Sequence, residues 1–245
     1  MLAANNLSIR RGGVRVVADV TTALEPGTLT AICGPNGAGK SSLLMGLAGL
    51  IAPDKGDVLL DAAALASMPP RERAKALGYL PQAADIAWDV AVETLVALGR
   101  LPHRDAAREP VEAAIAALSL EHLRHRPVSQ LSGGERARAL LARVLAGEPR
   151  WILADEPLAA LDLAHQLNLI ADLKTRAEAG QGVVMVLHDL ALAMNHADRV
   201  LVLNQGKLVA DAAPEAALSA ETLAQVWGVD ARWLGEPGMR ALIAR

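Results

Sequence analysis

The chain has 245 residues, 52% of them hydrophobic, which is enough for one large domain or for one domain with an inserted subdomain. Its formal net charge of −3 gives no electrostatic footprint for nucleic acid as the main partner, and its single cysteine, Cys33, excludes an intramolecular disulfide and a multi-cysteine metal site. The N-terminal segment lacks a basic region followed by an apolar run, and no uncharged apolar stretch approaches the ~18 residues of a membrane span, so we expect a soluble, cytoplasmic protein without a signal peptide.

Short strands and tight turns are expected in the first third of the chain. Residues 7–10 and 14–17 alternate around Gly12-Gly13, which predicts a hairpin. The other elements expected before residue 83 are a turn at 25–27, a buried strand at 29–33, a helix at 42–50, a turn at 53–56, an edge strand at 57–61, a polar helix at 71–77 and a short strand at 78–82.

From about residue 83 to 146 the strand signals vanish and helical apolar spacing takes over, most clearly at 92–98 and 111–118. We interpret this stretch as an all-helical insert. After it we expect strands at 151–154 and 183–187, a closing hairpin at 200–203 and 207–210, and a helical or irregular tail. The helix between the first two of these strands is predicted to bury a face made of Leu163, Leu167, Ile170, Leu173 and Ala177.

The order of these elements predicts an α/β fold with a mostly parallel sheet, because strands alternate with helices on both sides of the insert. An antiparallel β portion precedes the parallel part, and the inserted all-helical subdomain interrupts it. We place the core with its β portion at 1–82 and 147–213, the helical subdomain at 83–146 and the C-terminal tail at 214–245.

A glycine-rich loop between a predicted strand and a predicted helix matches the phosphate-binding pattern G-x-x-x-x-G-K-[ST]. Glycines let the backbone turn tightly so that its N–H groups converge on phosphate oxygens, and the helix start adds unpaired donors. Lys40 would place a charge near the outer phosphates and Ser41 would offer a hydroxyl to Mg²⁺. A turn that binds nothing is the less favoured alternative. The residues expected at the nucleotide are Gly34, Pro35, Asn36, Gly37, Ala38, Gly39, Lys40, Ser41 and Ser42.

Polar side chains follow the predicted strands at the edge where ligands bind to parallel sheets. Asp155 is expected to hold Mg²⁺, and Glu156 to polarise the attacking water. Adjacent carboxylates beside buried residues are costly without a cation, which disfavours the alternative that they only begin a turn. His188 is expected to contact the γ-phosphate; a structural histidine is the alternative. Gln82, a weaker signal, would reach Mg²⁺ or water through its amide.

The sequence Leu131-Ser132-Gly133-Gly134-Glu135 begins a predicted helix inside the insert. Ser-x-x-Glu is the pattern of a capping box, and we expect one here. A capped helix start with two glycines also presents backbone N–H groups to an anion, so Ser132, Gly133 and Gly134 are candidates for a phosphate site. Their position far from the P-loop in sequence does not place them at the chain's own nucleotide.

Taken together, these motifs resemble the ATP-binding cassette (ABC) transporter ATPases over nearly the whole chain. The matching stretches, in the family's order, are Gly34–Ser41, Gln82, Leu131–Glu135, Ile152–Glu156, Leu161-Asp162 and His188. The resemblance implies a P-loop NTPase core of the RecA-like kind, with ATP and Mg²⁺ as cofactors and Glu156 as catalytic base. It also implies a head-to-tail homodimer in which Ser132, Gly133, Gly134 and Asp162 act at the partner's ATP.

Within that family the chain is similar to the ATPases of importers for ferric siderophores, haemin and cobalamin. The supporting stretches are 98–103, 131–138 and 223–229, and the run Arg10-Arg11-Gly12-Gly13 looks closest to the haemin branch. Arg11 stands where the family usually has an aromatic residue that stacks on adenine, so we expect it at the nucleotide base; the alternatives are that it pairs with the triphosphate or points into water. A minor departure is Leu158-Ala159-Ala160, where a small hydroxyl residue is common.

The same resemblance implies two membrane-spanning permease subunits, reached from the inner face of the cell membrane, and indirectly a periplasmic or surface binding protein. Ile86, Trp88 and the helix at 92–100 are expected to form the docking groove. One rival reading is a soluble ABC ATPase that acts on DNA or the ribosome, which the lack of a basic patch disfavours. Another is a nucleotide-gated scaffold without activity, which the intact Asp155-Glu156 pair and His188 disfavour.

Overall fold

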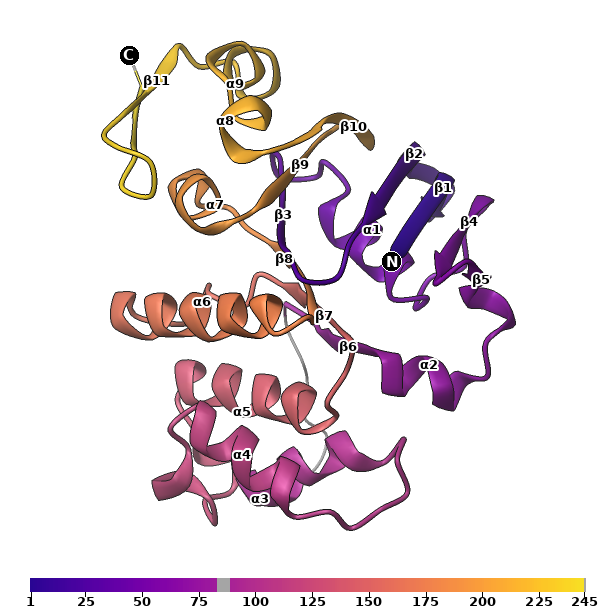
Figure 1. The fold of residues 1–245 in the computed structure, drawn as a ribbon, viewed down its shortest axis with the longest axis vertical. Helices are drawn as coiled ribbons and strands as arrows, with labels where there is room; N and C mark the ends of the chain where they lie inside the picture. The colour runs from indigo at the N-terminus through magenta and orange to yellow at the C-terminus, as the bar shows by residue number, and fades with distance from the viewer. Residues whose placement is uncertain (83–88, 245) are drawn as a thin grey trace.

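The computed structural model describes residues 1–82 and 89–244, and two sheets organise it (Figure 1). The larger sheet has the strand order β10-β9-β3-β8-β7-β6, in which all neighbours are parallel except β10 and β9. Its strands are β3 (Leu29–Cys33), β6 (Leu77–Leu80), β7 (Trp151–Asp155), β8 (Gly182–Val186), β9 (Arg199–Asn204) and β10 (Lys207–Ala212). The predicted α/β fold with a mostly parallel sheet is therefore confirmed.

The smaller sheet is antiparallel and has the order β2-β1-β4-β5. Its strands are β1 (Leu2–Arg11), β2 (Val14–Leu24), β4 (Lys55–Leu60) and β5 (Ala63–Ala64). The predicted hairpin around Gly12-Gly13 is confirmed. The prediction that 57–61 forms an edge strand is wrong, because the two-residue strand β5 pairs with the outer side of β4.

Helix α1 (Lys40–Leu47) packs between the two sheets, in contact with β1 and β2 on one side and β7 and β8 on the other. The parallel sheet is buried on both faces, so its strands divide their side chains between two hydrophobic clusters. In β3, Leu29 and Ala31 face one cluster and Ile32 faces the other. This alternation fixes the direction in which the loop leaves the sheet after Cys33.

The insert is helical where the structure describes it, as predicted. Helix α5 (Gly133–Ala146) packs against α3 (Val92–Ala97) and α4 (Glu109–Ala117). The buried Arg100 ties the loop after α3 to the end of α5: its Nη1 donates to the carbonyl oxygen of Ala146 (3.1 Å) and to Glu148 (2.7 Å). Short 3₁₀ helices span Leu65–Ser67, Leu98–Arg100, Glu121–Leu123 and Val128–Gln130.

Two features of the remaining chain differ from the sequence prediction. Helix α6 (Leu163–Glu178) buries side chains only from Leu169 onward, so Leu163 and Leu167 are 68% and 42% exposed and do not belong to the predicted buried face. The tail was predicted to be helical or irregular, but it also contains two strands. It contains the hairpin of β11 (Ala231–Leu234) and β12 (Ala241–Ala244), whose four-residue strands give too short an alternation to detect.

The other helices are α2 (Pro70–Ala76), α7 (Leu190–His196), α8 (Pro214–Ala217) and α9 (Ala220–Trp227). In the tail, the indole Nε1 of Trp233 donates to the carbonyl oxygen of Leu218 (2.8 Å), which holds the hairpin against α8 and α9. Within residues 1–82 and 89–244, no helix has the length and apolar character needed to cross a bilayer.

Cys33 ends the central strand β3 and is fully buried in the core. Burial raises the pKa of its thiol to about 12. Since the thiolate is the reactive form, Cys33 of the folded protein should resist labelling by a disulfide reagent at pH 8 and react at the rate of global unfolding. The measurement is labelling with and without guanidinium chloride. Complete labelling of the folded chain within minutes would contradict this burial.

Candidate functional site

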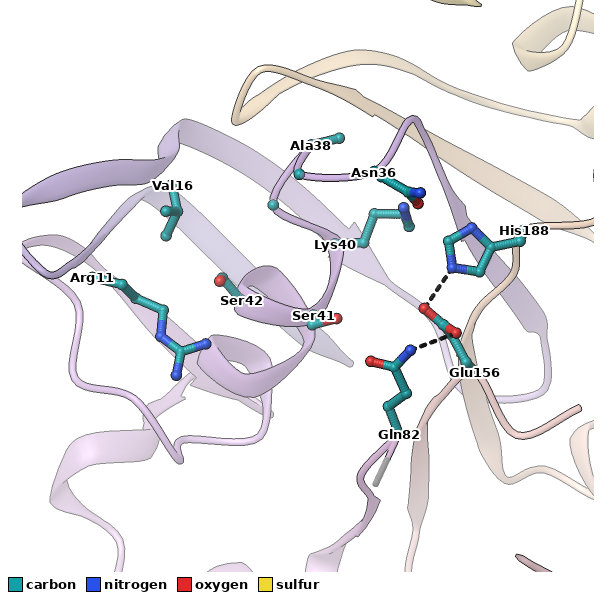
Figure 2. A pocket seen from close by; sticks show the side chains of 12 residues that line it. Arg11, Val16, Asn36, Ala38, Lys40, Ser41, Ser42, Gln82, Glu156 and His188 are labelled. Atoms are coloured by element: carbon teal, nitrogen blue, oxygen red, sulfur yellow. Dashed lines mark hydrogen bonds and ion pairs between the residues drawn. The ribbon is translucent and has the colours of Figure 1, made fainter. Parts of the chain in front are cut away.

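The loop from Gly34 to Gly39 joins β3 to α1 and lies at the edge of a cavity of about 710 Å³. Gly39 caps α1 with a positive φ of 100° and no side-chain hydrogen bond. The first N–H groups of the helix are therefore not satisfied by a capping side chain, as a helix start that binds anions requires. The cavity is lined by Arg11, Val16, Asn36, Gly37, Ala38, Gly39, Lys40, Ser41, Ser42, Gln82, Glu156 and His188 (Figure 2).

Lys40 is the cation that belongs to the loop itself. Its ammonium group donates to the carbonyl oxygens of Gly34 (2.8 Å) and Pro35 (3.0 Å), so the side chain folds back over the loop. Burial lowers the pKa of Lys40, and the negative charge of Glu156 opposes this effect. Two of its three N–H donors are used inside the loop, and an anion in the cavity can take the third.

Ser41 and Asp155 place two hard oxygen atoms side by side. The Ser41 hydroxyl donates to Asp155 Oδ1 (3.1 Å), and Asp155 is buried at the end of β7. Burial raises the pKa of the Asp155 carboxyl, against the effect of the Ser41 hydrogen bond. Burial disfavours the charged form of this carboxyl, and a cation that prefers oxygen ligands, such as Mg²⁺, would stabilise it. The pair therefore fits Mg²⁺.

Glu156 lies between two side chains that come from the neighbouring strands. Its Oε2 accepts from Gln82 Nε2 (2.7 Å), and its Oε1 accepts from His188 Nε2 (2.5 Å), as the dashed lines in Figure 2 show. Gln82 follows β6, Glu156 follows β7 and His188 follows β8, and these strands are neighbours in the sheet. Parallel strands end at one edge, which is why residues far apart in sequence meet here.

Arg11 is the last residue of β1 and lines the same cavity, as the sequence interpretation requires of a residue near the base. Figure 2 shows it beyond Ser41 and Ser42, at the end of the cavity away from Glu156. Val16 of β2 lines the cavity as well. The sequence analysis missed Val16, since one apolar residue in an alternating strand carries no signal of its own.

Ser132 forms the predicted capping box of α5. Its hydroxyl accepts from the backbone N–H of Glu135 (3.3 Å), and Glu135 Oε2 accepts from the Ser132 N–H (2.7 Å). Among the residues that the structure describes, neither Ser132, Gly133 nor Gly134 lines the cavity of Lys40. Gly133 instead borders a second cavity of about 290 Å³ between α5 and the ends of β6 and β7.

Asp162 is the N-cap of α6. Its Oδ1 accepts from the backbone N–H of His165 (2.9 Å) and contacts His165 Nδ1 (2.8 Å). In the described part of the chain it does not line the cavity of Lys40 either. Most of the predicted P-loop and strand-end residues thus line the cavity, Gly34, Pro35 and Asp155 are hydrogen-bonded to residues that line it, and Asp162 and the Ser132–Gly134 segment lie outside.

Comparison with known proteins identifies the family of the chain. The sequence model of the ABC transporter family matches residues 17–159. The hemin import ATP-binding protein HmuV of Pseudomonas entomophila is 43% identical over 238 residues, which cover 94% of this chain and 93% of that protein. HmuV of Myxococcus xanthus is 42% identical over 97% of this chain and 94% of its own length.

Among solved structures, the chain is similar to the dimeric post-hydrolysis state of the ATP-binding cassette MJ0796 bound to ADP and Pi. The TM-score is 0.78 at 27% identity, over 87% of this chain and 99% of that one. The fold, the loop geometry and the relatives agree, and the chain belongs to the ABC transporter family as one of its ATP-binding subunits.

Proposed function

We propose that this chain hydrolyses ATP to power an ABC importer of hemin. The hydrolytic part rests on one observation: the Glu156 carboxylate lies between Gln82 and His188, in the cavity that also holds Lys40 and Ser41. The cargo rests on relatives that carry the name hemin import and match this chain over almost its whole length. Those relatives favour hemin over the ferric siderophores and cobalamin that the sequence left open.

ATP fits the residues that surround the loop. The N–H groups at the start of α1 can bind phosphate oxygens without displacing a capping side chain, because no side chain caps the helix. Lys40 can exchange its bonds to the Gly34 and Pro35 carbonyls for bonds to the outer phosphates. Ser41 and Asp155, with Gln82 nearby, would hold Mg²⁺, which offsets phosphate charge when it is bound.

Glu156 acts as the general base of this mechanism. Its carboxylate accepts a proton from water while the water oxygen attacks the γ-phosphorus, and the bond from that phosphorus to the β–γ bridging oxygen breaks, leaving ADP and phosphate. His188 and Gln82 hold the two carboxylate oxygens at the ends of adjacent strands and so orient the base. His188 is also in position to contact the γ-phosphate.

A second copy of the chain completes the site. Ser132, Gly133 and Gly134 lie outside the chain's own Lys40 cavity, and the capping box of α5 uses the N–H groups of Ser132 and Glu135, so the N–H groups of Gly133 and Gly134 can face an anion. In the proposed head-to-tail dimer these residues bind the partner's ATP, with Asp162 at the interface. ATP favours the closed dimer and ADP the open one. ATP binding therefore closes the dimer, and hydrolysis reopens it.

Permease subunits would use this cycle at the inner face of the membrane, with a binding protein delivering the cargo from the other side. Ile86 and Trp88, predicted to line the docking groove, lie outside the described residues. The rest of the predicted groove, α3 and the turn after it, borders a cavity of about 430 Å³ that is lined in part by Glu93, Arg100 and Arg108. Leu101, which follows Arg100 in the chain, is 68% exposed.

Glu156→Gln should leave ATP binding intact and slow turnover by on the order of 10²–10⁴-fold, since an amide cannot accept the proton. ATP should then trap a dimer visible by gel filtration. In vesicles that hold the permease, hemin uptake should stop. The control is Glu178→Gln, on the exposed end of α6, which should keep wild-type turnover and uptake. Turnover of Glu156→Gln near that of the control would exclude Glu156 as the base.

Tethered mixed dimers test whether the two chains share each site. A Lys40→Ala chain joined to a Ser132→Arg chain has both lesions at one shared site and an intact second site, so it should retain turnover and bind ATP. The reciprocal control joins a doubly substituted chain to a wild-type chain, which damages both shared sites and should abolish turnover. The opposite pattern would show that Ser132 acts on its own chain's ATP.

Arg11 should discriminate between the bases of ATP and GTP less than an aromatic residue at this position would. A ring stacked on a base contributes roughly 1–3 kcal/mol, and a guanidinium loses part of that to its own hydration. GTP should therefore support turnover within about tenfold of ATP, Arg11→Tyr should tighten ATP binding, and Arg11→Ala should weaken it modestly. The Michaelis constants for ATP and GTP measure this. A thousandfold rejection of GTP by the wild type would remove Arg11 from the base.

A further inference from the structure

The turn between β9 and β10 contacts the phosphate-binding loop through backbone atoms alone. The N–H of Gly206 donates to the carbonyl oxygen of Ala38 (3.0 Å), and the carbonyl oxygen of Gly206 accepts from the N–H of Ala18 in β2 (2.8 Å). Gly206 therefore connects the loop to the antiparallel sheet. It does so from outside the nucleotide cavity, because Ala38 lines that cavity and Gly206 does not.

The contact has no room for side chains. A Cβ atom on Gly206 would lie 2.9 Å from the carbonyl oxygen of Val16, and one on Gly39 would lie 2.2 Å from the same oxygen. Gly206 also has a positive φ of 80°. Glycine at both positions thus lets β2, the β9–β10 turn and the loop touch backbone to backbone.

The direction of the Ala38 carbonyl decides the direction of the next N–H. In a trans peptide the C=O and N–H groups point in opposite directions, and the Ala38 carbonyl shares its peptide plane with the Gly39 N–H. The bond to Gly206 draws this carbonyl away from the cavity, so the Gly39 N–H points toward it. A carbonyl turned the other way would present a negative dipole to the phosphates.

We propose that Gly206 is a positioning residue for the nucleotide, which fixes the Ala38–Gly39 peptide in the orientation that binds phosphate. The inference rests on the proposed nucleotide site. The β9–β10 turn, more than 160 residues from the loop in sequence, then contributes to the affinity for phosphates. By thermodynamic linkage, nucleotide binding and the Gly206–Ala38 hydrogen bond stabilise each other.

The first test compares Gly206→Ala with Gly180→Ala. Gly180 also has a positive φ (101°), but a Cβ there meets nothing within 4 Å, so this control shares the backbone penalty without the contact. Calorimetric titration with Mg²⁺ and ADP should show about tenfold weaker binding for Gly206→Ala than for Gly180→Ala, as expected for the loss of one backbone hydrogen bond and the crowding beside it. Both variants should be folded at the temperature of the titration, with a lower thermal unfolding midpoint for Gly206→Ala because of this crowding. Equal affinities in the two variants overturn the proposal.

The second test uses the wild-type chain and does not depend on how a variant folds. Amide hydrogen exchange at Gly206 should slow when ADP binds, and by a larger factor than at Val183, whose N–H donates to Thr28 in the body of the sheet. Equal slowing at both amides, or none at Gly206, overturns the positioning role. A wild-type chain that binds no ADP would overturn the proposed nucleotide site itself, which separates the two failures.

Discussion

The structure depends on keeping a set of backbone N–H groups unpaired at the start of α1. A helix beginning is normally satisfied by a capping side chain or by water, and here Gly39 offers no side chain. Such a start must be held by its surroundings. The strand β3, buried on both faces, fixes one end of the loop, and α1, packed between the two sheets, fixes the other. Both sheets therefore help to fix the conformation of this short loop.

Charge is the second constraint, and the fold balances it only in part. Lys40 is buried near Asp155 and Glu156, and these carboxylates oppose the lowering of its pKa by burial. Asp155 in turn has its pKa raised by burial and by the charge of Glu156. The site therefore holds a cation that bonds to backbone carbonyls and a carboxyl group whose charged form is disfavoured by burial. Both groups favour a bound anion accompanied by a metal ion.

Local patterns in the sequence were sufficient for the loop, the strand ends and the capping box of Ser132, because each of these is specified within a few residues. Features that depend on tertiary neighbours were not predictable in the same way. The apolar spacing of α6 does not reveal that its first turns, with Leu163 and Leu167, extend beyond the core. Nor can a sequence show that β5 covers β4, or that Gly206 contacts Ala38, since backbone contacts leave no side-chain pattern.

Gln82 and Glu156 are 74 residues apart in sequence but follow adjacent strands, and the whole helical insert is the connection between those strands. The spacing of adjacent strands, about 4.8 Å, is set by their hydrogen bonds and not by the length of the chain that joins them. Doubling the length of a flexible connection costs only about 0.6 kcal/mol in closure entropy. The length of the chain between β6 and β7 therefore does not set the positions of the strand ends that carry Gln82 and Glu156.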